Sequence, residues 1–254
     1  MTLAIAEVAV RFGGVVAVDG VSLEVPPGHA VALVGPNGSG KTTLLNAICG
    51  LLAASGQVTL DGTGLPMGKP IRAARSGIAR TFQTPQVVDH LSCLDNVLLA
   101  SADRRSDGLM GAWLTRPRML GAERDRWRAG NESLERLGLA GLAAEPASRL
   151  TYGQRRWLEL ARVALARPRY LLADEPSAGL NDSETEQLVE HLGWFRDDGV
   201  GILLVDHKVD FLRAITDRAV VLALGHKVAE ASIDEVWDLP EVRAAYLGSR
   251  RVER

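Results

Sequence analysis

The chain has few cysteines, almost no net charge and no long apolar run, and each shortage excludes a class of protein. Its 254 residues include two cysteines, Cys49 and Cys93, which lie in apolar patterns without metal-ligand spacing. We expect both to be reduced core residues, as is usual in the cytosol. The net charge of −2 gives no electrostatic reason to expect nucleic acid as a partner.

The sequence also lacks the features that carry a chain into or across a membrane. It contains no run that approaches the roughly 18 apolar residues of a membrane span. Its start, MTLAIAEVAVRFGG, lacks the basic region and the cleavage site of a signal peptide. We therefore expect a cytoplasmic chain that, if it works at a membrane, docks onto a protein that spans it.

What is present is an α/β pattern. An apolar run at 30–35 ends in glycine and leads into a helical pattern at 42–52, which predicts a strand, a loop and a helix. The apolar runs at 170–175 and 201–207 are typical of buried parallel strands, with a helix expected between them at 182–195. Further strands are predicted at 3–12 and 21–25, where they form an antiparallel edge, at 57–62, and in a terminal hairpin at 218–225 and 226–231.

Residues 85–166 differ from the rest, because their patterns are mostly helical and include no convincing strand. We predict a helical insert there. Within it, residues 103–128 are rich in arginine, with Trp113 and Trp127 interleaved, as in some nucleic-acid-binding segments. Acidic residues dilute this charge, so a solvated helical face is the better interpretation.

The segment GPNGSGKT, residues 35–42, fits the phosphate-loop pattern GxxxxGK[ST] and follows a predicted strand. Gly38 and Gly40 allow backbone N–H groups to close around phosphate oxygens. Lys41 supplies a positive charge to the β- and γ-phosphates, the Thr42 hydroxyl suits Mg²⁺, and Thr43 can reach the α-phosphate. The predicted ATP-binding residues are Gly35, Pro36, Asn37, Gly38, Ser39, Gly40, Lys41, Thr42 and Thr43.

Four further positions have side chains that suit ATP hydrolysis. The apolar strand YLLAD ends at Asp174, which is placed to hold Mg²⁺, and Glu175 beside it can accept a proton from the attacking water. Gln83, after SGIARTF, can coordinate Mg²⁺ through its carbonyl oxygen. His207, at the end of GILLVDH, can bond a γ-phosphate oxygen. A glutamine in such a position is, taken alone, more often a surface residue, and a lone histidine more often a polar strand end.

The segment LTYGQ, residues 150–154, precedes a helical pattern that we expect to run to about Ala166, before Pro168. Thr151 is the predicted N-cap. The start of this helix is a second anion site, although the phosphate loop already surrounds one side of the ATP. It is useful if it faces the γ-phosphate bound by a different subunit, so that two chains enclose two nucleotides.

These elements, in this order, resemble the ATP-binding subunit of an ABC transporter over essentially the whole chain. The resemblance implies one ABC ATP-binding domain over 1–254. Its P-loop NTPase core, of RecA-like type, covers about 1–84 and 167–254, and its helical subdomain covers about 85–166. It also implies an adenine contact for Phe12, which stands where the family places an aromatic residue.

The resemblance gives each motif a name. It implies a Walker A loop at residues 35–42, a Q-loop at Gln83, a signature at Thr151, Tyr152, Gly153 and Gln154, a Walker B strand ending in Asp174 with the catalytic Glu175, a D-loop from Ser177 to Asn181 and an H-loop at His207. The common signature is LSGGQ, and the common D-loop ends in aspartate, so this chain departs at Thr151, Tyr152 and Asn181. How equally two nucleotide sites would contribute stays open.

The resemblance is more specific to the branched-chain amino acid transport ATPases in three segments, RFGGVVAVDGVSLEV, GIARTFQ and LTYGQRRWLELARVALA. Within that family, the long segment 103–128 is similar to the longer of the two ATPase paralogues. The resemblance implies ATP hydrolysis with Mg²⁺ at the inner face of the cell membrane. It also implies a shorter paralogue or a second copy as ATPase partner, two integral-membrane permeases, indirectly an external solute-binding protein, and no nucleic acid. Amide or urea uptake, lipopolysaccharide export and a soluble ABC ATPase outside transport stay open.

Overall fold

The computed structural model describes residues 2–101 and 116–249, so residues 103–115 of the arginine-rich segment, including Trp113, lie outside the described residues. The chain divides into two compact units. The core unit comprises Met1–Gln83 and Pro168–Arg254, and the helical unit comprises Thr84–Arg167.

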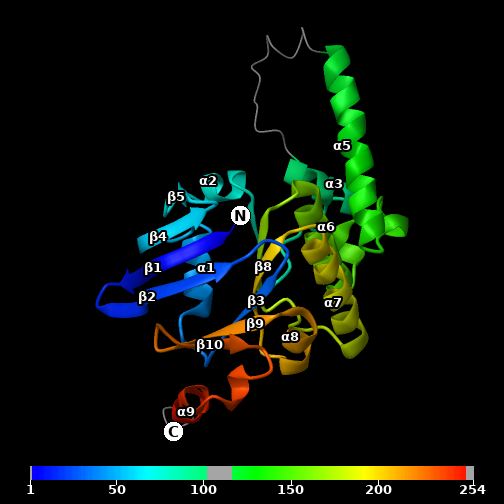
Figure 1. Cartoon of the computed structure of the whole chain (residues 1–254). Helices are drawn as coiled ribbons and strands as arrows, with labels where there is room; N and C mark the ends of the chain where they lie inside the picture. The colour runs from blue at the N-terminus through cyan, green and yellow to red at the C-terminus, as the bar shows by residue number, and fades with distance from the viewer. Residues whose placement is uncertain (1, 102–115, 250–254) are drawn as a thin grey trace. The chain divides into compact units, whose positions relative to one another are not determined.

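The first sheet of the core unit is antiparallel (Figure 1). Alternate residues of its longer strands, such as Leu3 and Ile5 and then Val8 and Val10, are buried, and so one face of the sheet packs into the core. The alternation is interrupted between Ile5 and Val8, where the register shifts and Glu7 has a φ of +49°. In the described residues the strand order is β2-β1-β4-β5, with bounds β1 (Leu3–Phe12), β2 (Val15–Val25), β4 (Ser55–Leu60) and β5 (Thr63–Leu65).

The second sheet of the core unit is mostly parallel. Its central strands are buried along their whole lengths, as expected for a parallel sheet that is covered on both faces. The last strand pairs antiparallel with its neighbour and forms the predicted terminal hairpin. The order in the described residues is β10-β9-β3-β8-β7-β6, with bounds β3 (Ala30–Val34), β6 (Ile78–Thr81), β7 (Tyr170–Asp174), β8 (Gly201–Val205), β9 (Arg218–Ala223) and β10 (His226–Ser232).

The strands β3, β8 and β7 are parallel neighbours, so their carboxyl ends meet at one edge of the sheet. Gly35, Glu175 and Asp206 each directly follow one of these ends. The helices of the core unit are α1 (Lys41–Ile48), α2 (Pro70–Arg75), α7 (Asp182–Asp197), α8 (Val209–Ile215), the 3₁₀ turn η4 (Val236–Asp238) and α9 (Pro240–Ser249). The predicted α/β class with an antiparallel edge is confirmed; α2, α8 and α9 were not predicted.

The helical unit has a small apolar core between α3, α5 and α6, to which Leu94, Leu134 and Leu158 contribute buried side chains. Gly130 lets α5 approach α3 closely, because a Cβ there would come within 2.9 Å of Leu94. Among the helices in the described ranges, none has the length and hydropathy to cross a membrane. The unit contains α3 (Cys93–Leu98), η1 (Leu99–Ser101), α5 (Arg116–Arg136), η2 (Ala140–Leu142), η3 (Ala147–Arg149) and α6 (Tyr152–Ala166).

Both cysteines are buried free thiols, as expected from the sequence. Burial raises the pKa of Cys49 to about 11, and the nearby Arg80 guanidinium opposes this shift only in part. Burial also raises the pKa of Cys93. Neither thiol is therefore ionised to a significant degree at neutral pH.

His191 of α7 is buried, and its ring packs against Trp194 with 4.7 Å between the ring centroids. Burial lowers the pKa of His191 from 6.5 to about 4, because desolvation disfavours the charged imidazolium. The unfolded chain binds this proton below pH 6.5 and the folded chain only below about pH 4. The stability that the neutral ring contributes is thus complete above pH 6.5 and is lost as the pH falls towards 4.

We expect the pH dependence of stability to weaken in His191→Phe, which cannot titrate at this position. Between pH 7 and 4, the free energy of unfolding of the wild type should fall by about 3 kcal/mol more than that of the variant. Denaturant unfolding at a series of pH values measures this difference. His90→Gln removes an exposed histidine and should keep the wild-type slope. An equal pH dependence of the free energy of unfolding in His191→Phe and the wild type would contradict the lowered pKa of His191.

Candidate nucleotide site

The loop between β3 and α1 is built around three glycines with positive φ angles. Gly35 has a φ of +148°, and a Cβ there would collide with the backbone carbonyl oxygen of Leu222. Gly40 has a φ of +101°, and a Cβ there would collide with the carbonyl oxygen of Ala17. At Gly38 the space is open, and the φ of +75° alone favours glycine. Neighbouring strands therefore fix the path of this loop.

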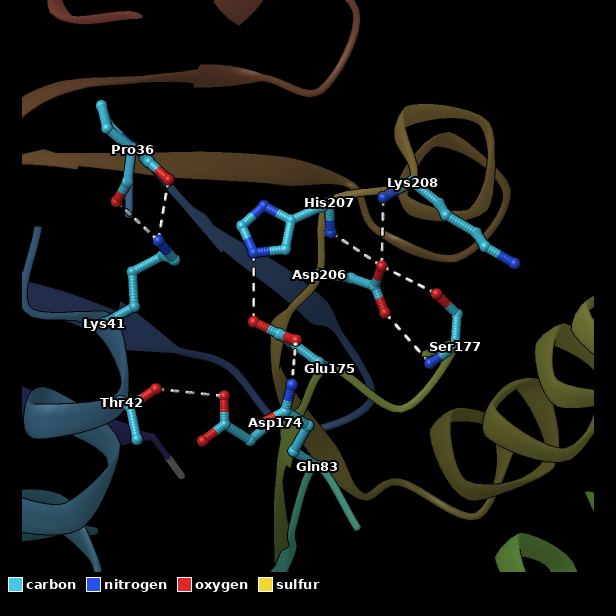
Figure 2. Close-up of polar contacts among 11 residues, drawn as sticks. Pro36, Lys41, Thr42, Gln83, Asp174, Glu175, Ser177, Asp206, His207 and Lys208 are labelled. Atoms are coloured by element: carbon cyan, nitrogen blue, oxygen red, sulfur yellow. Dashed lines mark hydrogen bonds and ion pairs between the residues drawn. The ribbon is translucent and has the colours of Figure 1, made fainter. Parts of the chain in front are cut away.

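Lys41 begins α1, and its ammonium group is turned back onto the loop that precedes it. The Nζ atom donates hydrogen bonds to the carbonyl oxygens of Gly35 at 2.7 Å and Pro36 at 2.9 Å (Figure 2). Burial lowers the pKa of Lys41, and the Glu175 and Asp174 carboxylates oppose this shift. The ammonium group is thus bonded to oxygen acceptors of the loop, and phosphate oxygens are acceptors of the same kind.

The remaining loop residues differ in exposure. Ser39 is buried and Thr43 is half-buried, whereas Asn37 and Thr42 are exposed. The turn between β9 and β10 supports the loop, since the Gly225 N–H donates to the Ser39 carbonyl oxygen at 3.2 Å. Phe12 is half exposed at the end of β1, and its contact with adenine stays a prediction.

Asp174, at the end of β7, is buried and has two side-chain partners. Its Oδ1 accepts a hydrogen bond from the Thr42 hydroxyl at 3.4 Å, and its Oδ2 accepts one from Arg80 at 2.9 Å. Arg80 also donates to the Asn46 side chain of α1 and lies 5.0 Å from the ring centroid of Phe82. Arg80 was missed in the sequence, where it is an isolated cation in the short strand pattern that precedes Gln83.

The chemistry of this pair suits a magnesium ion. The Thr42 hydroxyl and the Asp174 carboxylate are oxygen donors, the kind that Mg²⁺ prefers. Gln83 was predicted to join them, but the contact described for its amide nitrogen is with Glu175, at 2.9 Å. A metal role for Gln83 stays a prediction.

Glu175 adopts an uncommon backbone conformation, with a φ of +48°. Its N–H donates to the Val205 carbonyl oxygen at 2.7 Å, which ties it to the end of β8. Its carboxylate lies between the Gln83 amide and the His207 ring, whose Nε2 is 3.1 Å from Oε1 (Figure 2). Such strain persists only where the surroundings enforce it, often at functional sites. The structure thus brings Gln83, Glu175 and His207 together.

The signature segment lies in the helical unit at the start of α6. Thr151 caps the helix, because its hydroxyl accepts from the Gln154 N–H at 3.2 Å while the Gln154 side chain accepts from the Thr151 N–H at 3.0 Å. Gly153 is buried and Tyr152 is exposed. The predicted N-cap and the predicted end of the helix at Ala166 are confirmed. Two N–H groups of this helix start are already bonded within the chain.

The D-loop residues have structural partners that were not predicted. Ser177 is buried against Asp206, to which both its N–H and its hydroxyl donate. Asn181 caps α7 through a second capping box, with Glu184 as the reciprocal partner at 2.9 and 3.0 Å. Asparagine caps a helix as well as aspartate does, so the departure at Asn181 keeps this local structure.

Solved structures of ATP-binding cassettes share this fold. MJ1267, an ATP-binding cassette of an ABC transporter solved in its ADP conformation, has a TM-score of 0.83 at 28% identity, over 98% of this chain and 99% of that one. A nucleotide-free ATP-binding cassette from an ABC transporter has a TM-score of 0.83 at 29% identity, over 97% and 99% of the two chains. The fold is therefore that of ABC ATPase cassettes, as predicted.

The sequence comparisons agree. The family described as ABC transporter matches residues 18–178. The high-affinity branched-chain amino acid transport ATP-binding protein BraF of Pseudomonas aeruginosa is 36% identical over 97% of both chains. The corresponding protein LivG of Salmonella typhimurium is 38% identical, also over 97% of both. The chain belongs to the ABC transporter family and is one of its ATPases. Membership implies a nucleotide substrate and membrane permease partners.

We expect Arg80→Met to destabilise the fold strongly, because it leaves the Asp174 carboxylate buried without its cation. Both side chains of the pair are nearly inaccessible, at 6% and 7% exposed. Removing one partner of such a pair costs about 3 kcal/mol or more, measured as the free energy of unfolding in urea.

The control for this substitution is Arg213→Met, which removes an exposed partner of Asp234. It should cost less than about 1 kcal/mol. The double variant Arg80→Met/Asp174→Asn should recover part of the loss, since the buried charge is then gone. Equal losses for the two arginine variants would contradict the importance of the buried pair.

Proposed function

We propose that this ATPase binds ATP at residues 35–43 and hydrolyses it with Glu175, as a subunit of a transporter that imports branched-chain or related amino acids. The observation that carries the proposal is the position of Glu175, held between Gln83 and His207 at the sheet edge that also bears the Lys41 loop (Figure 2). The names of the relatives BraF and LivG support the class of cargo.

In this proposal the phosphates lie at the start of α1. Backbone N–H groups of the loop and the helix dipole favour an anion there, and the Lys41 ammonium exchanges its carbonyl partners for phosphate oxygens. Thr42 and Asp174 would hold Mg²⁺, which would supply positive charge against the phosphates. Arg80 fixes the Asp174 carboxylate, so one oxygen stays turned towards Thr42.

The hydrolytic step uses the neighbouring carboxylate. Glu175 orients a water molecule and accepts its proton, because it is the part-exposed carboxylate at this edge. His207 contacts the same carboxylate and bonds a γ-phosphate oxygen. Gln83 holds the other carboxylate oxygen, so the orientation of Glu175 depends on both neighbours.

We also propose that the core unit is the RecA-like part, and the helical unit the helical subdomain, of one ATP-binding domain. The tip of α6, with Thr151 and Gly153, then completes the nucleotide site of a second ATPase chain, either a shorter paralogue or another copy. The capping box supports this, because it gives the tip a fixed backbone before any partner arrives. Two permeases hold the pair at the inner face of the membrane, and an external binding protein delivers the solute to them.

Glu175→Gln should lower ATP hydrolysis by the assembled transporter at least about 100-fold, because the amide cannot accept the proton of water. ATP affinity should stay near the wild-type value. Phosphate release and equilibrium ATP binding measure the two quantities. Glu241→Gln, an equivalent change at an exposed position of α9, is the control and should leave both unchanged. Wild-type turnover in Glu175→Gln would reject its role as the catalytic carboxylate.

Lys41→Ala should act on ATP affinity and not primarily on the hydrolytic step. It removes the positive charge that the loop holds at its centre, so ATP affinity itself should fall at least about tenfold. Titration with a fluorescent ATP analogue, monitored without turnover, measures it. Lys227→Ala removes an exposed lysine of β10 and should not change the affinity. Unchanged affinity in Lys41→Ala would contradict a phosphate-binding role for Lys41.

A further inference from the structure

Asp206 is a buried carboxylate to which the proposed function gives no role. It follows β8 and directly precedes His207. Its Oδ1 accepts hydrogen bonds from the Ser177 hydroxyl at 2.8 Å and from the His207 N–H at 2.7 Å (Figure 2). The Lys208 N–H donates to the same oxygen at 3.0 Å, and the Ser177 N–H donates to Oδ2 at 3.1 Å. One carboxylate therefore joins Ser177, at the start of the D-loop, to the backbone N–H groups of His207 and Lys208.

Lys208, on the other side of His207, reaches the far end of the same loop. Its Nζ donates to the Leu180 carbonyl oxygen at 3.1 Å and to the Thr185 hydroxyl at 3.2 Å. The Thr185 hydroxyl in turn donates to the Asn181 carbonyl oxygen at 2.8 Å. The two residues that flank His207 thus hold both ends of the segment 177–181.

We propose that Asp206 and Lys208 are positioning residues, which fix the D-loop to His207 so that the two move as one piece. This inference rests on the proposed function, in which His207 and Glu175 act on ATP. We call the four residues Ser177, Leu180, Asp206 and Lys208 the clamp.

The energetics favour a rigid connection. Hydrogen bonds to an ionised carboxylate are roughly twice as strong as those between neutral groups, and this one accepts four. A buried carboxylate that loses such donors is costly to keep. If Ser177 moves, Asp206 must follow it or lose its partners. Because Asp206 also bonds the N–H of His207, the ring that faces Glu175 then moves as well.

The clamp predicts a specific kinetic effect. ATP binding depends on the loop at 35–43, which shares no described hydrogen bond with the clamp. Hydrolysis depends on the position of His207 against Glu175, where a shift of about 1 Å can cost about 100-fold. Releasing the clamp should therefore lower kcat and leave ATP affinity unchanged. A purely structural role would instead lower the active fraction or change both quantities together.

The test compares Asp206→Asn, Ser177→Ala and Lys208→Met in the assembled transporter. The asparagine keeps the size of Asp206 but removes its charge, and its amide nitrogen cannot accept the hydrogen bond that the Ser177 N–H donates to Oδ2. We expect kcat to fall about 10- to 100-fold in Asp206→Asn, and by a smaller factor in the other two, with ATP affinity within about twofold of the wild type. Ser177→Ala removes the hydroxyl that donates to Oδ1, so its effect in the Asp206→Asn background should be smaller than in the wild type, because both changes weaken the same connection.

Two outcomes would overturn the clamp. One is a wild-type kcat in Asp206→Asn when the separate variant Glu175→Gln is inactive. That result keeps the proposed function and rejects the clamp. The other is a loss of kcat accompanied by a proportional loss of affinity. Should Asp206→Asn fail to fold, Lys208→Met decides, because Lys208 is exposed and its removal buries no unpaired charge. An unchanged kcat in Lys208→Met and Ser177→Ala then rejects the proposal.

Discussion

The register between β7 and β8 is the constraint on which the candidate site depends. These strands are parallel, with Asp174 paired to Val205, so the residues that follow them, Glu175 and Asp206, reach the same sheet edge together. The bond from the Glu175 N–H to Val205 continues the pairing one residue beyond the strand. A slip of one residue would turn each side chain to the opposite face of the sheet and would separate Glu175 from His207.

The charges at this edge are distributed so that one carboxylate differs from the others. Asp174 is buried and bonded to an arginine and a hydroxyl, and Asp206 is buried and accepts four hydrogen bonds. Glu175 is a quarter exposed and contacts an amide and an imidazole. The two buried carboxylates are therefore suited to holding neighbouring groups in place, whereas Glu175 is accessible to water and suited to proton transfer.

Local patterns predicted the buried strands, the phosphate loop and the capped helix α6, because each depends on residues that lie near one another in the sequence. The contacts of Arg80 and Asp206 could not be predicted in this way. Arg80 meets Asp174 across 94 positions and Ser177 meets Asp206 across 29, through strand pairing that no local pattern reveals. The helices α2 and α8 were missed because they have only 6 and 7 residues, too few to show a period. The capping box at Asn181 was visible as N-x-x-E and was not used.

The burial of the two cysteines has a practical consequence for labelling. Protonated, enclosed thiols react slowly with maleimides and with oxidants, since the thiolate is the reactive form. A single cysteine introduced at an exposed position would therefore be modified in preference to Cys49 and Cys93. Spectroscopic probes can thus be attached one at a time without first replacing the natural residues, and the apolar packing around them stays undisturbed.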